Sequence, residues 1–226
     1  MELNADFTKR AAVHGAGMLW LQSPIAGVER RMLDRVGDEV ARATTIVRYA
    51  AGSRFSAHTH GGGEEFLVLE GVFTDEHGDY PTGSYVRNPP TSSHRPGSAL
   101  GCTILVKLWQ FDPGDRNQIH LRTQQLPFDP APERPGVGIK RLFQDASETV
   151  RLESWAPGTK IRLPPAGGLE LFVLRGQFTE CTENFETWSW LRLPTDMALQ
   201  TQAGPAGCIL WIKAGHLRAL APPAVP

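Results

Sequence analysis

Apolar residues along the chain alternate with polar ones or gather in short runs, and turn-forming residues separate the runs. Residues 43–50 (ATTIVRYA) alternate and are β-branched, while residues 64–76 and 102–111 are apolar and aromatic. Segments rich in Gly, Pro, Asn and Ser lie between them, at residues 51–54, 76–84 and 88–98. This pattern predicts an all-β protein made of many short strands.

A helix is harder to find in this pattern. Residues 28–43 (VERRMLDRVGDEVARA) are charged enough for an amphipathic helix, but Gly37 interrupts them and their apolar spacing is poor. The 23 glycines and 18 prolines are spread along the whole chain, as tight turns between strands require. We therefore predict little helix.

The chain also repeats itself. Residues 49–76 are echoed by residues 155–182, and Gly71, Pro89 and Cys102 return about 105 residues later as Gly176, Pro194 and Cys208. This repeat predicts a tandem duplication of one all-β unit, with domains at residues 1–125 and 126–226. The proline-rich residues 126–136 are the expected linker.

The histidines of the first copy are not repeated in the second. With a one-residue deletion near Pro164, the two histidines His58 and His60 face Pro164 and Ala166 or the neighbour of Ala166, and His94 faces Leu199. Such asymmetry is what a single functional site on a duplicated scaffold would leave. We expect the second half to hold no metal, because Glu170 alone cannot retain one against water.

The segment HTHGGGEE, residues 58–65, places two histidines on one face of a strand. The three glycines after them let the chain turn and return a carboxylate to that face, and a later strand could deliver His94 from the opposite wall. Imidazoles with a carboxylate suit Zn, Fe(II), Mn, Ni or Cu, although a polar cluster on the protein surface could have the same sequence. The residues alone leave open whether Glu64 or Glu65 is the carboxylate that joins His58, His60 and His94.

These residues carry a family resemblance. Gly52, His58, His60, Glu64 and Gly71 match every gap of the first cupin motif, and only Glu64, not Glu65, leaves six residues before Gly71. The second motif is matched by its glycine, proline and histidine, whereas Thr91 and Ser98 stand where glycine and asparagine are usual; the matching residues are Gly83, Pro89 and His94. The sequence therefore resembles a cupin, which implies two tandem jelly-roll β-barrels. The resemblance also implies that the metal ligands are His58, His60, Glu64 and His94, with Glu65 behind the site or at its rim.

Residues 50–96 are more closely similar to the cupin half of ChrR-type anti-sigma factors. That resemblance implies zinc binding and a part in sensing singlet oxygen or organic peroxides. Those factors hold their sigma factor with an N-terminal helical zinc domain, marked by a His and a Cys-x-x-Cys. Residues 1–40 contain no cysteine and no pattern for a long helix. We therefore expect a regulatory or sensing protein that lacks this domain and uses another surface or a separate regulatory partner.

The cofactor expected is one divalent metal per chain, zinc first, with Fe(II), Mn or Ni as alternatives. The second function class is an Fe(II)-dependent dioxygenase that acts on a small molecule, since related cupins hold iron and leave positions open for substrate and oxygen. A metal-stabilised binding protein without turnover is the third. No separate general base stands out, so no catalytic residue is assigned.

Composition and charge limit the kinds of partner that we expect for this protein. The formal net charge is −1 with scattered charges, which excludes a nucleic-acid-binding surface, and no apolar run approaches the ~20 residues of a membrane span. The N-terminus does not read as a signal peptide, so we expect a cytoplasmic protein, and a homodimer. The remaining residues with reactive side chains are expected to be ordinary: free cysteines Cys102, Cys181 and Cys208, histidines His14, His77, His120 and His216, and rim arginines Arg54 and Arg87.

Overall fold

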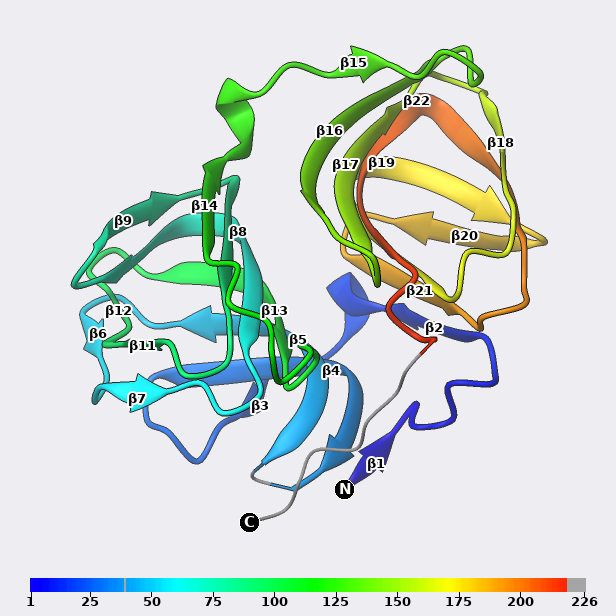
Figure 1. Cartoon of the computed structure of the whole chain (residues 1–226). Coiled ribbons are helices and arrows are strands. Elements are labelled where there is room, and N and C mark those ends of the chain that lie inside the picture. Colours follow the sequence, from blue (N-terminus) through cyan, green and yellow to red (C-terminus); the bar gives the residue numbers. More distant parts are fainter. Residues whose placement is uncertain (39, 219–226) are drawn as a thin grey trace. The chain divides into compact units, whose positions relative to one another are not determined.

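The computed structural model describes residues 1–38 and 40–218, and these residues are mostly strand (Figure 1). Strand accounts for 58% and helix for 3%, the latter confined to two 3-10 turns, η1 (Gly15–Gly17) and η2 (Thr123–Gln125). No helix within the described ranges is long and apolar enough to cross a membrane. The predicted all-β fold, with two jelly-roll barrels and little helix, is confirmed.

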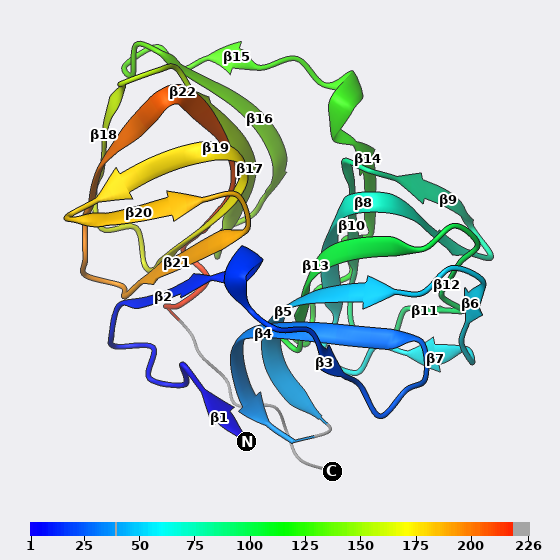
Figure 2. The ribbon, with the colours of Figure 1, turned by 180° about the vertical axis from the view of Figure 1, so that it is seen from behind.

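The first compact unit comprises Met1–Ala5 and Leu19–Gln125 (Figures 1 and 2). Its main sheet runs in the order β1-β4-β5-β13-β8-β10-β14, and β7 and β11 form a separate pair at one end of the barrel. The strands are β1 (Glu2–Leu3), β3 (Leu21–Gln22), β4 (Val28–Gly37), β5 (Ala41–Tyr49), β6 (Ser53–Arg54), β7 (His58–Thr59), β8 (Glu64–Asp75), β9 (Gly78–Pro81), β10 (Ser84–Asn88), β11 (Ser93–His94), β12 (Gly97–Ser98), β13 (Cys102–Leu108) and β14 (Ile119–Arg122).

The interior of the first barrel is apolar and aromatic. Alternate residues of the central strands point inward, among them Phe66 and Val68 of β8 and Ile104 and Val106 of β13. Phe73 and further aromatic side chains close the cluster. This packed core therefore supports the short strands at the end of the barrel.

The second unit comprises Asp6–Met18 and, of the described residues, 126–218. Its sheet runs β15-β16-β17-β22-β19-β21-β2, with β18 on β22 and β20 on β19. The strands are β2 (Ala11–His14), β15 (Asp129–Pro130), β16 (Val137–Gln144), β17 (Thr149–Trp155), β18 (Lys160–Leu163), β19 (Leu169–Glu180), β20 (Glu183–Glu186), β21 (Ser189–Leu193) and β22 (Leu199–Ala214).

The N-terminal strand β2 belongs to the second unit, although the predicted boundary assigned residues 1–125 to the first domain. β2 pairs with β21, with Ala12 opposite Leu191, just as β14 pairs with β10 in the first barrel. The expected linker also lies in this unit: β15 pairs with β16, and Ala131 is buried in the core. Both segments supply backbone partners to strands that would otherwise be sheet edges.

The charged segment that resembled an interrupted helix is strand β4. A bulge shifts its register against β5 between Met32 and Asp34, so that Leu33 and Asp34 are both buried. The bulge breaks the alternation that would have revealed a strand.

The repeated glycines have the same structural reason in both barrels. Gly71 and Gly176 have φ of +73° and +77°, and a Cβ on either would collide with the carbonyl oxygen of Gly101 or Gly207. Only glycine fits such a turn, which explains why both copies retain it.

Candidate metal centre

The four predicted ligands meet at one end of the first barrel. β7 pairs with β11 so that His58 lies directly opposite His94, His60 follows β7, and Glu64 begins β8 (Figure 1). One ligand atom from each of His58, His60, Glu64 and His94 lies within 4.8 Å of all the others. His58 is exposed and the other three are buried, so the centre opens to solvent on one side.

The distances within this cluster suit a bound metal. The Oε2 atom of Glu64 is 3.4 Å from Nε2 of His60 and 3.5 Å from Nε2 of His94. Adjacent ligands at bond lengths near 2.1 Å are separated by roughly 3.0–3.4 Å. The carboxylate and two imidazoles are therefore spaced almost as a metal would hold them.

His60 is held in the tautomer that a metal needs. Its Nδ1 lies 2.9 Å from the hydroxyl oxygen of Ser92, and that hydroxyl donates its own hydrogen to the carbonyl of Pro89 at 2.6 Å. Ser92 must therefore accept from the Nδ1–H of His60. The lone pair of Nε2 is left facing the cluster.

His94 is oriented in the same way by a carboxylate. Its Nδ1 lies 3.3 Å from Oδ2 of Asp75, the last residue of β8. The other oxygen of Asp75 accepts hydrogen bonds from the backbone N–H of His77 and from the hydroxyl of Tyr80. Asp75 and Ser92 were not recognised in the sequence as parts of the site, because nothing in their spacing marks them.

Two buried nitrogens at the centre test whether a metal fits. The Nε2 atoms of His60 and His94 have no hydrogen-bond partner and are shielded from water. Leaving such atoms unsatisfied is costly, and a cation bound between them and Glu64 would satisfy both. The donor set of three imidazoles and one carboxylate suits a divalent transition metal and does not by itself select one.

Burial and neighbouring charge act differently on the two buried histidines. Burial lowers the pKa of His60, and the nearby imidazoles of His94 and His58 lower it further, so this ring stays neutral and available as a ligand. Burial also opposes charge on His94, but the hydrogen bond to Asp75 raises the pKa of His94 overall. The hydrogen bond to Asp75 keeps a proton on Nδ1 of His94, and the raised pKa means that a proton competes with a metal for Nε2 more strongly at His94 than at His60.

Glu64 and Glu65 occupy opposite faces of β8. Glu64 points into the cluster and accepts a 3.4 Å hydrogen bond from the amide of Asn88. The carboxylate of Glu65 instead accepts a 2.5 Å hydrogen bond from Tyr85 and is buried. The expectation that Glu65 stands behind the site or at its rim is therefore not met, because consecutive strand residues face opposite sides.

Two aromatic side chains, Trp109 and Phe111, pack directly against the three glycines between His60 and Glu64 and leave no room for a Cβ there; we call them the aromatic cover. A Cβ on Gly61 would lie 2.8 Å from the Trp109 ring, a Cβ on Gly62 would collide with the same indole, and one on Gly63 would collide with Phe111. Trp109 and Phe111 also donate backbone hydrogen bonds to Gly63 and Gly62. The cover fixes the turn that returns Glu64 to the histidines.

Thr91 stands where the second cupin motif has glycine, and its backbone shows why glycine is usual. Its φ of +75° lies in the left-handed region, which is costly for a β-branched residue. The backbone N–H of Thr91 donates to the carbonyl of His60, and the N–H of His60 donates to Ser92. The strained turn thus ties β11 to the ligand His60.

The corresponding place in the second barrel carries apolar side chains. Leu163 of β18 lies opposite Leu199 of β22, as His58 lies opposite His94. His58 therefore corresponds to Leu163 and His60 to Pro165, one residue earlier than the pairing with Pro164 and Ala166 inferred from the sequence. The extra residue of the first barrel lies between β6 and β7, where β18 is continuous.

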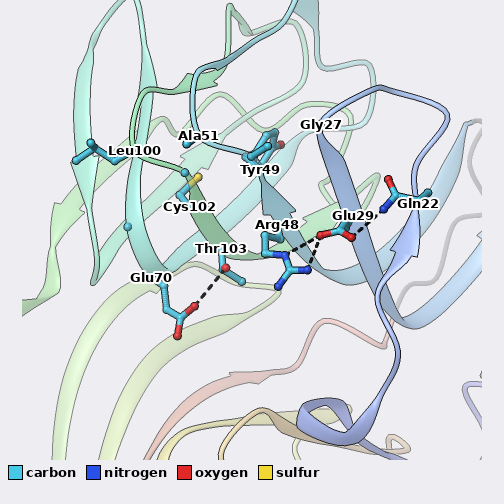
Figure 3. A pocket seen from close by; sticks show the side chains of 13 residues that line it. Gln22, Gly27, Glu29, Arg48, Tyr49, Ala51, Glu70, Leu100, Cys102 and Thr103 are labelled. Atoms are coloured by element: carbon cyan, nitrogen blue, oxygen red, sulfur yellow. Dashed lines mark hydrogen bonds and ion pairs between the residues drawn. The ribbon is translucent and has the colours of Figure 1, made fainter.

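The first barrel has another cavity, an open groove of about 620 Å³ lined by Arg48, Glu29, Glu70 and Cys102 among others (Figure 3). Arg48 is paired with Glu29, and Thr103 donates to Glu70. The Cys102 side chain is 4% exposed, and burial raises its pKa to about 11. This thiol is protonated at neutral pH, which fits the expectation of an inert buried cysteine.

Most of the remaining singled-out residues have structural partners. Arg87 is buried rather than at a rim, pairs with Asp115 at 2.6 Å and stacks on Phe111. His216 lies 2.8 Å from Glu170, which corresponds to Glu65 and not to a ligand. Cys208 is buried like Cys102, and Cys181 and Arg54 are exposed.

The model of the ChrR cupin-like domain family matches the sequence twice, over residues 8–112 and 116–218. The chain belongs to the ChrR cupin-like family. Both barrels of this cupin are thus copies of the same domain, and among the described residues only the first copy carries the histidine and glutamate cluster.

Solved structures with the same fold share little sequence with this cupin. They include a candidate dioxygenase from Nostoc punctiforme, at 14% identity over 95% of this chain and 85% of that chain, with a TM-score of 0.77. An oxalate decarboxylase from Lactobacillus farciminis matches at 11% identity, 91% and 86% coverage and a TM-score of 0.63. A cupin 2 conserved barrel protein from Leptotrichia buccalis matches at 10%, 90% and 95%, and 0.59. A search of curated proteins found no match.

Proposed function

We propose that this protein is a metal-dependent regulatory cupin that responds to an oxidant or small ligand at its first barrel. The observation that carries the proposal is the pair of buried Nε2 atoms, oriented by Ser92 and Asp75 toward Glu64. Membership of the ChrR cupin-like family over both barrels supports regulation rather than unrelated metal storage.

In this proposal His58, His60, Glu64 and His94 hold one zinc ion per chain. The bound ion supplies an electrophilic centre that can take up an oxygen-donor ligand. His58 is exposed, so an incoming molecule approaches from its side, while His60 and His94 are braced by hydrogen bonds from behind. The response passes to a regulatory partner protein or to a second copy of the chain.

The experiment begins with protein purified without added metal and measures its metal content by elemental analysis. The zinc-loaded protein is then exposed to singlet oxygen or an organic hydroperoxide, and metal release and oligomeric state are followed. One zinc per chain, with release or a change of oligomer on exposure, supports the proposal. Less than half a metal per chain after zinc loading contradicts it.

An Fe(II)-dependent dioxygenase is the second candidate, favoured by the exposed edge at His58, which leaves room for a substrate to approach. Oxygen uptake by the Fe(II)-loaded protein, with a panel of β-diketones and thiols, separates the two. Turnover above ~1 per second, ordinary for an enzyme, would replace the sensing assignment.

A further inference from the structure

Behind the metal ligands lies a second open cavity, of about 540 Å³. We call it the posterior cavity, and its lining residues are His77, Thr91, Ser92, Ser93, Gln118 and His120. It is open to solvent, since five of its six lining residues are exposed and only Ser92 is partly buried. None of the four predicted ligand residues lines it.

The lining is rich in hydrogen-bond donors. The hydroxyls of Thr91 and Ser93, the amide and the two imidazoles can each donate a hydrogen bond, whereas the Ser92 hydrogen is donated to the Pro89 carbonyl. Among the described residues, no acidic or permanently cationic side chain lines the cavity. The acids of the neighbouring turn are engaged elsewhere: Asp75 accepts from His94 and Tyr80, and Glu76 accepts from the backbone N–H of Arg95. Such a surface suits an oxyanion.

Two hydrogen-bonded paths connect the cavity with the metal ligands. The shorter one is Ser92, a lining residue whose hydroxyl accepts from His60. The longer one begins at His120, whose Nδ1 is 3.5 Å from the Tyr80 hydroxyl. Tyr80 then donates to Asp75, the residue that orients His94. Both buried imidazole ligands therefore have a support that reaches this cavity.

We propose that the posterior cavity binds a small oxyanion, a carboxylate or sulfate-like group, and that the bound anion tightens metal binding at the first barrel. An anion that takes the Ser92 hydrogen away from the Pro89 carbonyl polarises the hydroxyl. The Ser92 oxygen then becomes a better acceptor for His60, which makes Nε2 a stronger ligand. The coupling rests on the proposed metal site, whereas anion binding itself does not.

The first test uses metal-free protein, with acetate and sulfate as probes, and follows the ring proton signals of His77 and His120 by NMR. Saturable shifts are expected in the wild type. The double variant Ser93→Ala/His120→Ala should bind roughly tenfold more weakly or worse, because hydrogen bonds to a charged group are lost. His14→Ala, in the second unit, is the matched control and should bind like the wild type. Shifts that do not saturate, or equal binding by the double variant, overturn the proposal.

The second test measures zinc affinity by chelator competition, with and without saturating sulfate. We expect tightening of about fivefold in the wild type and none in the double variant, and the same factor when sulfate binding is compared between metal-free and zinc-loaded protein. Anion binding with unchanged zinc affinity overturns the coupling. Anion binding by a protein that retains no metal would instead sink the proposed function and leave the cavity assignment standing.

Discussion

The two barrels share a strand pair that carries polar side chains in the first barrel and apolar side chains in the second. In the first barrel the pair brings His58 against His94, and in the second it brings Leu163 against Leu199, which packs in an apolar core. The turn glycines Gly71 and Gly176 and the buried cysteines are the same in both. The scaffold is thus held by turns and core, and the residues at the barrel end are free to differ.

The largest effect is expected from removing one ligand. His60→Ala should take metal content from about one per chain to near zero, because a carboxylate and two imidazoles lose a buried imidazole partner. The barrel should remain folded, since the second barrel folds without any of these donors. Elemental analysis and circular dichroism measure the two quantities.

His14→Ala, in the second unit, is the control for that variant and should keep its metal. Glu64→Gln and Glu65→Gln provide a second pair, in which only Glu64→Gln should lose metal. Full metal content in His60→Ala would dismiss the ligand assignment.

The second barrel has its own buried charge where the first has Val47. Glu153 is fully buried and accepts from both terminal nitrogens of Arg134, from Arg151 and from the Trp155 indole. Glu153→Gln should cost about 3 kcal/mol of unfolding free energy, because two partly buried arginines lose their fully buried carboxylate partner. Urea unfolding followed at the second barrel gives the value, with the exposed Glu186→Gln as control.

The same residue gives a pH dependence. Burial opposes the charge of Glu153, but the arginines outweigh it and hold its pKa below the ordinary value. Its contribution to stability is therefore complete above the unfolded-state pKa and is lost as pH falls through the lower folded-state pKa. Wild-type stability should fall more steeply than that of Glu153→Gln over this acid range. Parallel slopes would show that Glu153 carries no such linkage.

A smaller effect is expected behind the ligands of the first barrel. Asp75→Asn should weaken zinc binding between about 10-fold and 100-fold, because an amide orients His94 less strongly and does not raise its basicity. Chelator competition measures the affinity. As a control, Asp79→Asn removes the same charge from an exposed position nearby. If both variants weaken zinc binding equally, Asp75 acts through its charge alone and not through its hydrogen bond to His94.

The smallest effect concerns backbone strain at residue 91, which the corresponding position of the second barrel does not share. Thr91 has a positive φ, whereas the corresponding Asp196 does not. Thr91→Gly should stabilise the first barrel by about 1 kcal/mol, measured by thermal unfolding of metal-free protein. Asp196→Gly should not stabilise the second barrel, since no strain is relieved there. A destabilised Thr91→Gly would mean that the threonine side chain contributes more than its backbone costs.

The clustering of His58, His60, Glu64 and His94 could be predicted from the sequence because strand alternation and motif spacing are local properties of these residues. The same alternation places Glu65 on the opposite face of β8. Asp75 and Ser92 could not be found, because their roles arise when β8 and the turn before β11 meet the histidines. Strand β4 was missed because its bulge removes the period, and β2 because nothing local shows that it pairs with β21.

The indole of Trp109 lies flat against Gly61 and Gly62, in the turn that separates His60 from Glu64. A fluorophore thus rests on the segment whose two ends would be drawn together by a cation. Its emission should report occupancy directly, without an added dye, and a stopped-flow trace would give the rates of metal entry and exit. Trp109→Phe, which keeps an aromatic ring over the glycines, would identify that signal among the six tryptophans.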